Sequence, residues 1–154
     1  MAASDPQRAL REHVLYLLGG GGAHTDFDHT VTGFPAALRG KRPRGAPHSA
    51  WELLEHMRIA QWDILEFTRD ASHTSPEWPA GYWPETSGPP NRLAWSKSVA
   101  AFQADLKAIE DLVADAATDL LAPIPHGQGQ TVLREALLAA DHNSYHLGQL
   151  MLVR

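Results

Sequence analysis

The chain of 154 residues contains no cysteine, and this absence removes several kinds of chemistry at once. Without cysteine there is no disulfide framework, no thiolate metal site and no catalytic thiol that the protein itself provides. Long apolar runs are also missing, since no stretch approaches the roughly 20 apolar residues of a membrane-spanning helix. The opening residues Met1–Pro6 lack the basic start and apolar stretch of a secretory signal. We therefore expect a soluble cytoplasmic protein with no membrane partner.

The chain has fewer positively than negatively charged residues. The chain has 13 Lys and Arg residues against 18 Asp and Glu residues, a formal net charge of −5, which argues against a nucleic-acid partner. One basic run, Arg39–Arg44, is interpreted as a solvated loop. Hydrophobic residues make up 44% and charged residues 20%, an ordinary globular composition. At this length we expect one folded domain over residues 1–154.

Alternating runs of β-branched residues are absent, so no sheet is expected. Apolar residues instead recur at spacings of three and four, which indicates helices with one buried face. Four segments show this spacing: about Pro6–Leu18, about Ser49–Arg69, a stretch from after Pro90 to before Pro123, and one from near Thr131 almost to Arg154. The sequence therefore predicts an all-α four-helix bundle.

The connections between these helices are unequal in length. The second helix has the clearest start, because Ser49 followed by Glu52 forms the pattern of a capping box. About thirty residues, Gly19–His48, precede it, enough to cross the bundle or to form a lid. The second long connection contains the aromatic segment Trp78–Pro84, which we expect to pack over an end of the bundle.

Two histidines, His142 and His146, are four residues apart within the last predicted helix. One helical turn brings such a pair onto the same face, where two neutral imidazoles can bind one divalent metal ion. The spacing also arises by chance, and two ligands do not complete a site. A third ligand on a facing helix is therefore the feature to look for.

His56 meets this requirement. At 100° per residue it shares an arc of the second helix with Leu53, Ala60 and Phe67, which should face the interior. Three imidazoles with one open position are typical of catalytic rather than structural zinc, and they also suit other transition metals. We predict a divalent transition metal, with zinc or nickel ahead of iron, manganese and cobalt.

Histidine ligands usually donate their second ring N–H to an acceptor. Polar side chains on the same helical arcs are candidates for this role: Glu135, Asp63, Tyr145 and Gln149. Other metal and nucleophile motifs are missing, including His-Glu-x-x-His, the Glu-x-x-His pairs of di-iron bundles, the Gly-x-Ser-x-Gly elbow and the phosphate-binding loop. The three histidines are thus the strongest site that the sequence offers.

Two segments resemble one known family. Pro47–Asp63 is similar to the second helix, and Asp141–Gln149 to the fourth helix, of the DinB-like superfamily, which includes bacterial thiol S-transferases. The resemblance implies an up-down-down-up bundle and a metal held by one histidine of the second helix and two of the fourth. Those positions correspond to His56, His142 and His146. The resemblance also implies a homodimer.

Two hypotheses about function follow. The first is a metal-dependent enzyme, either a transferase acting on a low-molecular-weight thiol or a hydrolase that activates water. Because the chain has no cysteine, the thiol would have to be a small-molecule substrate. Tyr145 and Asp63 are predicted to assist with proton transfer or substrate positioning. The alternative is a non-catalytic bundle that binds a metal or small ligand and acts through a dimer or partner interface.

Overall fold

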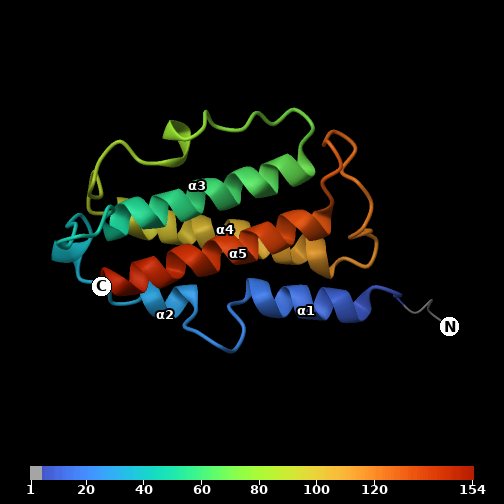
Figure 1. Ribbon diagram of the computed structural model, residues 1–154, viewed down its shortest axis with the longest axis horizontal. Coiled ribbons are helices and arrows are strands. Elements are labelled where there is room, and N and C mark those ends of the chain that lie inside the picture. The colour runs from blue at the N-terminus through green and yellow to red at the C-terminus, as the bar shows by residue number, and fades with distance from the viewer. Residues whose placement is uncertain (1–4) are drawn as a thin grey trace.

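The computed structural model describes residues 5–154, and Figure 1 shows that it is built from helices. The elements in chain order are α1 (Arg8–Leu18), α2 (Phe27–Val31), the 3-10 helix η1 (Ala36–Leu38), α3 (Ala50–Arg69), the 3-10 helix η2 (Ala80–Tyr82), α4 (Ala94–Ala114) and α5 (Val132–Leu152). Within the described residues there is no strand, only one isolated bridge between Pro123 and Thr131. The all-α prediction is confirmed. The expected domain of residues 1–154 includes residues 1–4, which lie outside the described residues.

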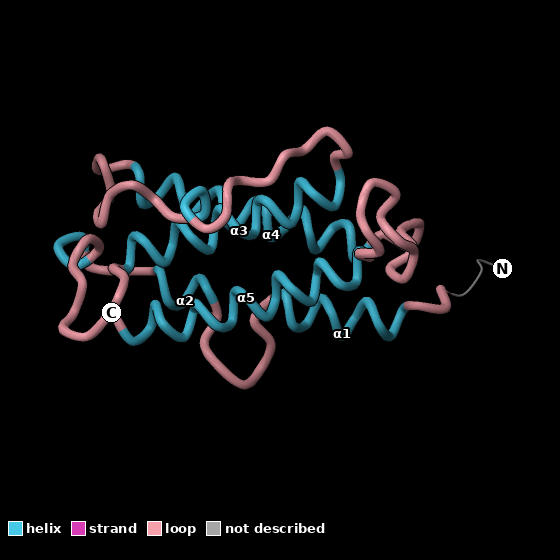
Figure 2. Tube along the Cα trace, turned by 45° about the horizontal axis from the view of Figure 1, so that its top comes forward, coloured by secondary structure: helices cyan, strands magenta, loops and turns pink. Residues whose placement is uncertain are grey.

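The long helices lie side by side along one axis (Figures 1 and 2). α3 packs against α4 and α5, and α1 packs against the same two helices. α2 continues along the side of the molecule that α1 occupies, beyond an outward loop (Figure 1). None of the helices formed by residues 5–154 combines the length and apolarity that a membrane crossing requires.

The segment Gly19–His48, expected to cross the bundle or to form a lid, contains α2 and η1. Asp26 caps the start of α2: its side chain accepts a hydrogen bond of 2.7 Å from the backbone N–H of His29. The guanidinium of Arg154 then donates to the carbonyls of His29, Thr30 and Thr32. A five-residue helix spans little more than one turn, so it leaves no periodic pattern in the sequence.

The start of α3 agrees with the predicted capping box. Ser49 Oγ accepts from the backbone N–H of Glu52, and the Glu52 carboxylate accepts from the N–H of Ser49 at 2.7 Å. Arg42 also donates to this carboxylate, at 2.8 Å from Nε, and lowers its pKa. Part of the basic run Arg39–Arg44 is therefore bound to the helix start and is not simply a solvated loop.

The core consists of two apolar clusters. One includes Trp51, Leu54, Met57, Phe102, Leu147 and Leu150, and the other includes Leu18, Ile64, Leu65, Val113, Ala136 and Ala140. Between their levels on α3 and α5 lie two amides, Gln61 and Asn143. Gln61 donates to the carbonyl of Phe102 at 2.8 Å and accepts from Asn143 at 2.7 Å. These bonds satisfy much of a buried polar layer, and His142 directly precedes Asn143 on α5.

The connection between α3 and α4 runs back along α3, as the yellow-green trace in Figure 1 shows. The aromatic segment Trp78–Pro84 therefore does not cover an end of the bundle, as the sequence suggested. It contacts the side of α3, where the Trp83 indole lies 4.0 Å from the ring of His56. Because α3 and α4 pack side by side with their starts near one end, the chain must return along their length, and this places the segment beside the histidines.

Candidate metal centre

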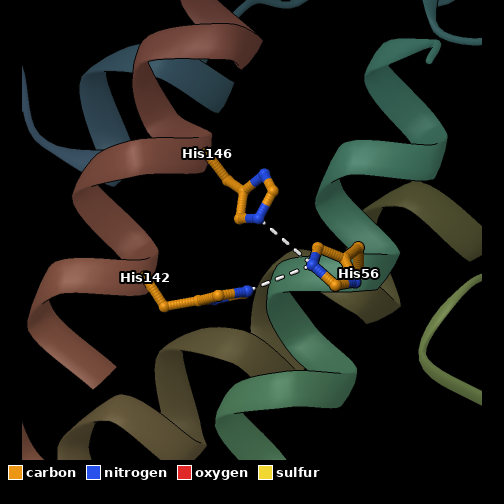
Figure 3. Close-up of side chains that lie close together, drawn as sticks. All are labelled: His56, His142 and His146. Carbon is orange, nitrogen blue, oxygen red and sulfur yellow. Dashed lines mark hydrogen bonds between the residues drawn. The ribbon is translucent and has the colours of Figure 1, made fainter. Parts of the chain in front are cut away.

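Three histidine side chains converge between α3 and α5 (Figure 3). The Nε2 atom of His56 lies 3.1 Å from Nε2 of His146 and 3.1 Å from Nε2 of His142. The ligand atoms of all three lie within 4.8 Å of one another. His56 and His146 are buried and His142 is half-buried, so the structure brings together the three residues predicted from the sequence.

The hydrogen bonds on the far side of two rings fix their tautomers. Nδ1 of His56 lies 2.9 Å from the backbone carbonyl oxygen of Tyr82, and Nδ1 of His146 lies 2.7 Å from Oε1 of Gln149. Both partners are acceptors, so each Nδ1 must carry the proton. In the neutral rings each Nε2 is then left with a bare lone pair. Two such lone pairs face each other at 3.1 Å, which is unfavourable unless a cation lies between them.

A proton is a poor candidate for that cation. Burial lowers the pKa of His142 to about 3, and His146 and His56 contribute further to this shift. Burial also lowers the pKa of His56 and of His146. At neutral pH all three rings are therefore neutral and present ligand nitrogens.

The spacing of the nitrogens suits a metal ion. Nitrogens bound at about 2.0–2.1 Å to a tetrahedral ion lie about 3.3 Å from one another. Two of the three separations are 3.1 Å, close to this value. His142 is the least constrained ligand, because its Nδ1 is buried without a hydrogen-bond partner. The donor set therefore fits a divalent transition metal.

Asp63, predicted to be catalytic, lies in a hydrogen-bonded cluster beside the histidines. Its Oδ2 accepts from the Tyr82 hydroxyl at 2.6 Å, and its Oδ1 accepts from Nε2 of His73 at 2.7 Å. Burial, and then Asp63, raise the pKa of Tyr82 to about 12, so the phenol stays a donor. The same Tyr82 provides the carbonyl that orients His56. Asp63 thus fixes the loop residue that in turn fixes a ligand.

Trp83 is a second contact that the sequence did not identify. Its indole is stacked between two imidazoles, 4.0 Å from the ring of His48 and 4.0 Å from the ring of His56. The His56 and Trp83 planes are inclined by only 4°. Together with the Tyr82 carbonyl, this stacking holds the His56 ring in one orientation. The aromatic richness of Trp78–Pro84 was the available signal.

The other candidate residues have different positions. Gln149 contacts a ligand directly, as expected. Tyr145 places its ring edge-on to His146, with centroids 4.9 Å apart, and is largely exposed. Glu135 does not belong to the centre, because its carboxylate accepts from Arg134 and lines a separate small cavity with Ile64.

A cavity of about 480 Å³ opens beside the three histidines. Its walls come from α3, α5 and the long loop between α3 and α4: His56, Ala60, Asp63, Ile64, Trp78, Tyr82, Leu138, Asp141, His142, Tyr145 and His146. This volume lies within the range of small-molecule sites in proteins. A ligand in the cavity would therefore lie against the three histidines.

Comparisons with known proteins give one family. The sequence model of the DinB superfamily matches residues 22–150, a span that includes all three histidines and the loop residues that orient His56. Searches among curated proteins and among solved structures each found no match. The family match extends over most of the helices that form the bundle. On this match, the chain belongs to the DinB superfamily.

Proposed function

We propose that the protein is a metal-dependent enzyme whose metal is held by His56, His142 and His146. The observation that carries this proposal is the pair of bare Nε2 atoms that face each other at 3.1 Å, each with its Nδ1 proton already engaged. Zinc or nickel suits three imidazoles best, and iron, manganese and cobalt are alternatives. When bound, such a metal supplies an open position at which a thiol or a water molecule is activated near neutral pH.

The reaction proposed is S-transfer from a low-molecular-weight thiol, or hydrolysis. In either case the chain's own residues bind and orient the reactants. The cavity of about 480 Å³ admits a small molecule next to the histidines. Tyr145, exposed on the cavity wall, positions the substrate through its hydroxyl. Tyr82, held by Asp63, keeps a proton on its phenol and orients His56.

Three further features belong to the proposal, and the family resemblance implies the first two. They are the up-down-down-up order of the helices, a homodimer and a cytoplasmic location. Cross-linking and sedimentation of the purified protein would test the homodimer directly. A sedimentation coefficient of the monomer at all concentrations would contradict it.

Metal content is the first test. Protein purified without an affinity tag should contain a transition metal, or take one up on reconstitution, in close to one equivalent. His142→Ala should lose this metal, whereas His13→Ala, a change of an exposed histidine on α1, should not. Less than about a tenth of an equivalent in the reconstituted wild type would contradict the proposal.

Turnover is the second test. Wild type, His142→Ala and His13→Ala would be compared on low-molecular-weight thiols with an electrophilic acceptor, and on ester and amide substrates. Only His142→Ala should lose activity. Equal turnover in all three proteins would exclude catalysis at this centre.

One observation favours a non-catalytic alternative. Both oxygens of Asp63 are engaged by Tyr82 and His73, so this carboxylate is not a free general base. In this second hypothesis the bundle senses a metal or small ligand. Stoichiometric metal without turnover of any substrate in the panel would support it over the enzyme.

A further inference from the structure

The cavity beside the histidines has an unusual combination of side chains at its walls. Three aromatic residues line it: Trp78 and Tyr82 from the loop, and Tyr145 from α5. Trp78 is 74% exposed and Tyr145 is 66% exposed, so large apolar rings face solvent at this site. Exposed aromatic surface of this kind beside a cavity is typical of a ligand-binding site.

The rings form a continuous wall on the loop side. The Trp78 and Tyr82 rings are edge-to-face, with centroids 5.4 Å apart and planes inclined by 61°. The Tyr82 hydroxyl donates to Asp63 at 2.6 Å, so its polar end is already occupied. What Tyr82 offers a ligand is therefore ring surface, and ring faces attract cations.

The charges on the cavity wall are all of one sign. Asp63 and Asp141 contribute carboxylates, and among residues 5–154 no lysine or arginine lines the cavity. Asp141 lies on the exposed side of α5, one residue from His142. The nearest basic residue along that helix, Arg134, donates to Glu135 instead. Both oxygens of Asp63 are already engaged, so an anionic ligand would meet the Asp141 carboxylate and would find no partner here other than the metal itself.

We propose that this cavity binds an organic cation, a substituted ammonium group on an apolar body, with the cation held between the aromatic rings and Asp141. The role of this ligand as a substrate rests on the proposed function, since the cavity leads to the three histidines. The binding itself does not require a metal. A quaternary ammonium group is the favoured form, because it gains from ring faces and loses little hydration on entry.

The test uses two probes of similar shape and opposite charge, benzyltrimethylammonium and benzylsulfonate. Each is titrated into the full chain, freed of metal by chelation, and followed by changes in backbone amide chemical shifts. The cation should bind at least about tenfold more tightly than the anion. Its shifts should map to residues 138–146 and to the loop at 78–82. Equal or tighter binding of benzylsulfonate would overturn the inference.

Two pairs of variants distinguish binding of the cation in this cavity from a general attraction of the cation to an acidic protein. Asp141→Asn should weaken the cation at least about threefold, whereas Asp111→Asn, at an exposed carboxylate on α4, should not. Trp78→Ala should weaken it too, whereas Leu93→Ala, which removes another exposed large apolar side chain elsewhere, should not. If both members of a pair act alike, the cation is not held in this cavity.

Zinc binding is measured on the same samples. If the protein takes up zinc but does not bind the cation, the proposed function stands and this inference is wrong. If it binds the cation but no metal, the cavity is a ligand site and the proposed function is wrong. The two failures are therefore distinguishable.

Discussion

Protonation of the three histidines should destabilise the metal-free protein as the pH falls. The pKa of His142 is about 3 in the folded chain, against 6.5 as its ordinary value. Between these two pH values the unfolded chain binds a proton at His142 that the folded chain does not. The free energy of unfolding must therefore decrease as the pH is lowered through this window, and the loss is absent above the ordinary value.

The magnitude follows from the difference between the two pKa values. Each pKa unit corresponds to 1.36 kcal/mol, so lowering the pH from 7 to 5 should cost about 2 kcal/mol through His142 alone. The pKa values of His56 and His146 are lowered in the same direction. The unfolding free energy of the wild type should therefore decrease by more than the contribution of His142 alone.

Urea denaturation at pH 7 and at pH 5, with a chelator present, measures this loss. The quantity to compare is the difference in unfolding free energy between the two pH values. It should be about 2 kcal/mol smaller in His142→Gln, which keeps a polar side chain but cannot titrate in this range. His13→Gln, on the exposed face of α1, should behave as the wild type. If His142→Gln and the wild type show the same pH dependence, His142 does not occupy the apolar, half-buried position that lowers its pKa.

Three further predictions concern the surroundings of the ligands. Gln149→Leu should weaken zinc binding about 10–100-fold in calorimetric titrations, because His146 loses the acceptor for its Nδ1 proton, and Gln149→Glu should not. Tyr82→Phe should lower the unfolding free energy measured in urea by about 1–3 kcal/mol, because Asp63 loses a hydrogen-bond donor. It should weaken zinc binding less than Gln149→Leu does, since the Tyr82 carbonyl remains. An equal loss of zinc affinity in the two variants would contradict these separate roles. Zinc at one hundred times its Kd should raise the unfolding free energy of the wild type by about 2.7 kcal/mol and leave His146→Ala unchanged, and a gain in both would show that zinc binds elsewhere.

The sequence predicted the long helices and the proximity of the three histidines because both depend on repeated spacing. α3, α4 and α5 each span 20 or 21 residues, so their apolar pattern extends over several turns. The proximity of His142 and His146 follows from the geometry of one helical turn, and the position of His56 follows from identifying the inward face of its helix. These properties are local to a helix, so they can be predicted without knowledge of the tertiary structure.

The contacts that orient the ligands could not be predicted in this way. The acceptor for His56 is a backbone carbonyl, which every residue has, so nothing in the sequence distinguishes Tyr82. The helical arc correctly placed Asp63 near His56, but its two partners come from a loop whose path depends on how α3 and α4 pack. Glu135 shared the arc of His142 and nevertheless pairs with Arg134. A helical wheel gives the direction of a side chain but not its partner.

The place of the histidines in the fold explains how a bundle holds three neutral imidazoles with opposed lone pairs. Both apolar clusters are built from side chains other than those of His56, His142 and His146. Burial in those clusters, which dominates folding stability, is therefore available whether or not a cation is bound. The rings of His56 and His146 are meanwhile held by groups outside the clusters: the Tyr82 carbonyl and the Trp83 indole hold His56, and the Gln149 amide holds His146. Two of the three ligands are thus preorganised by contacts that do not involve the metal, and the electrostatic repulsion between the Nε2 atoms is what a bound cation would relieve.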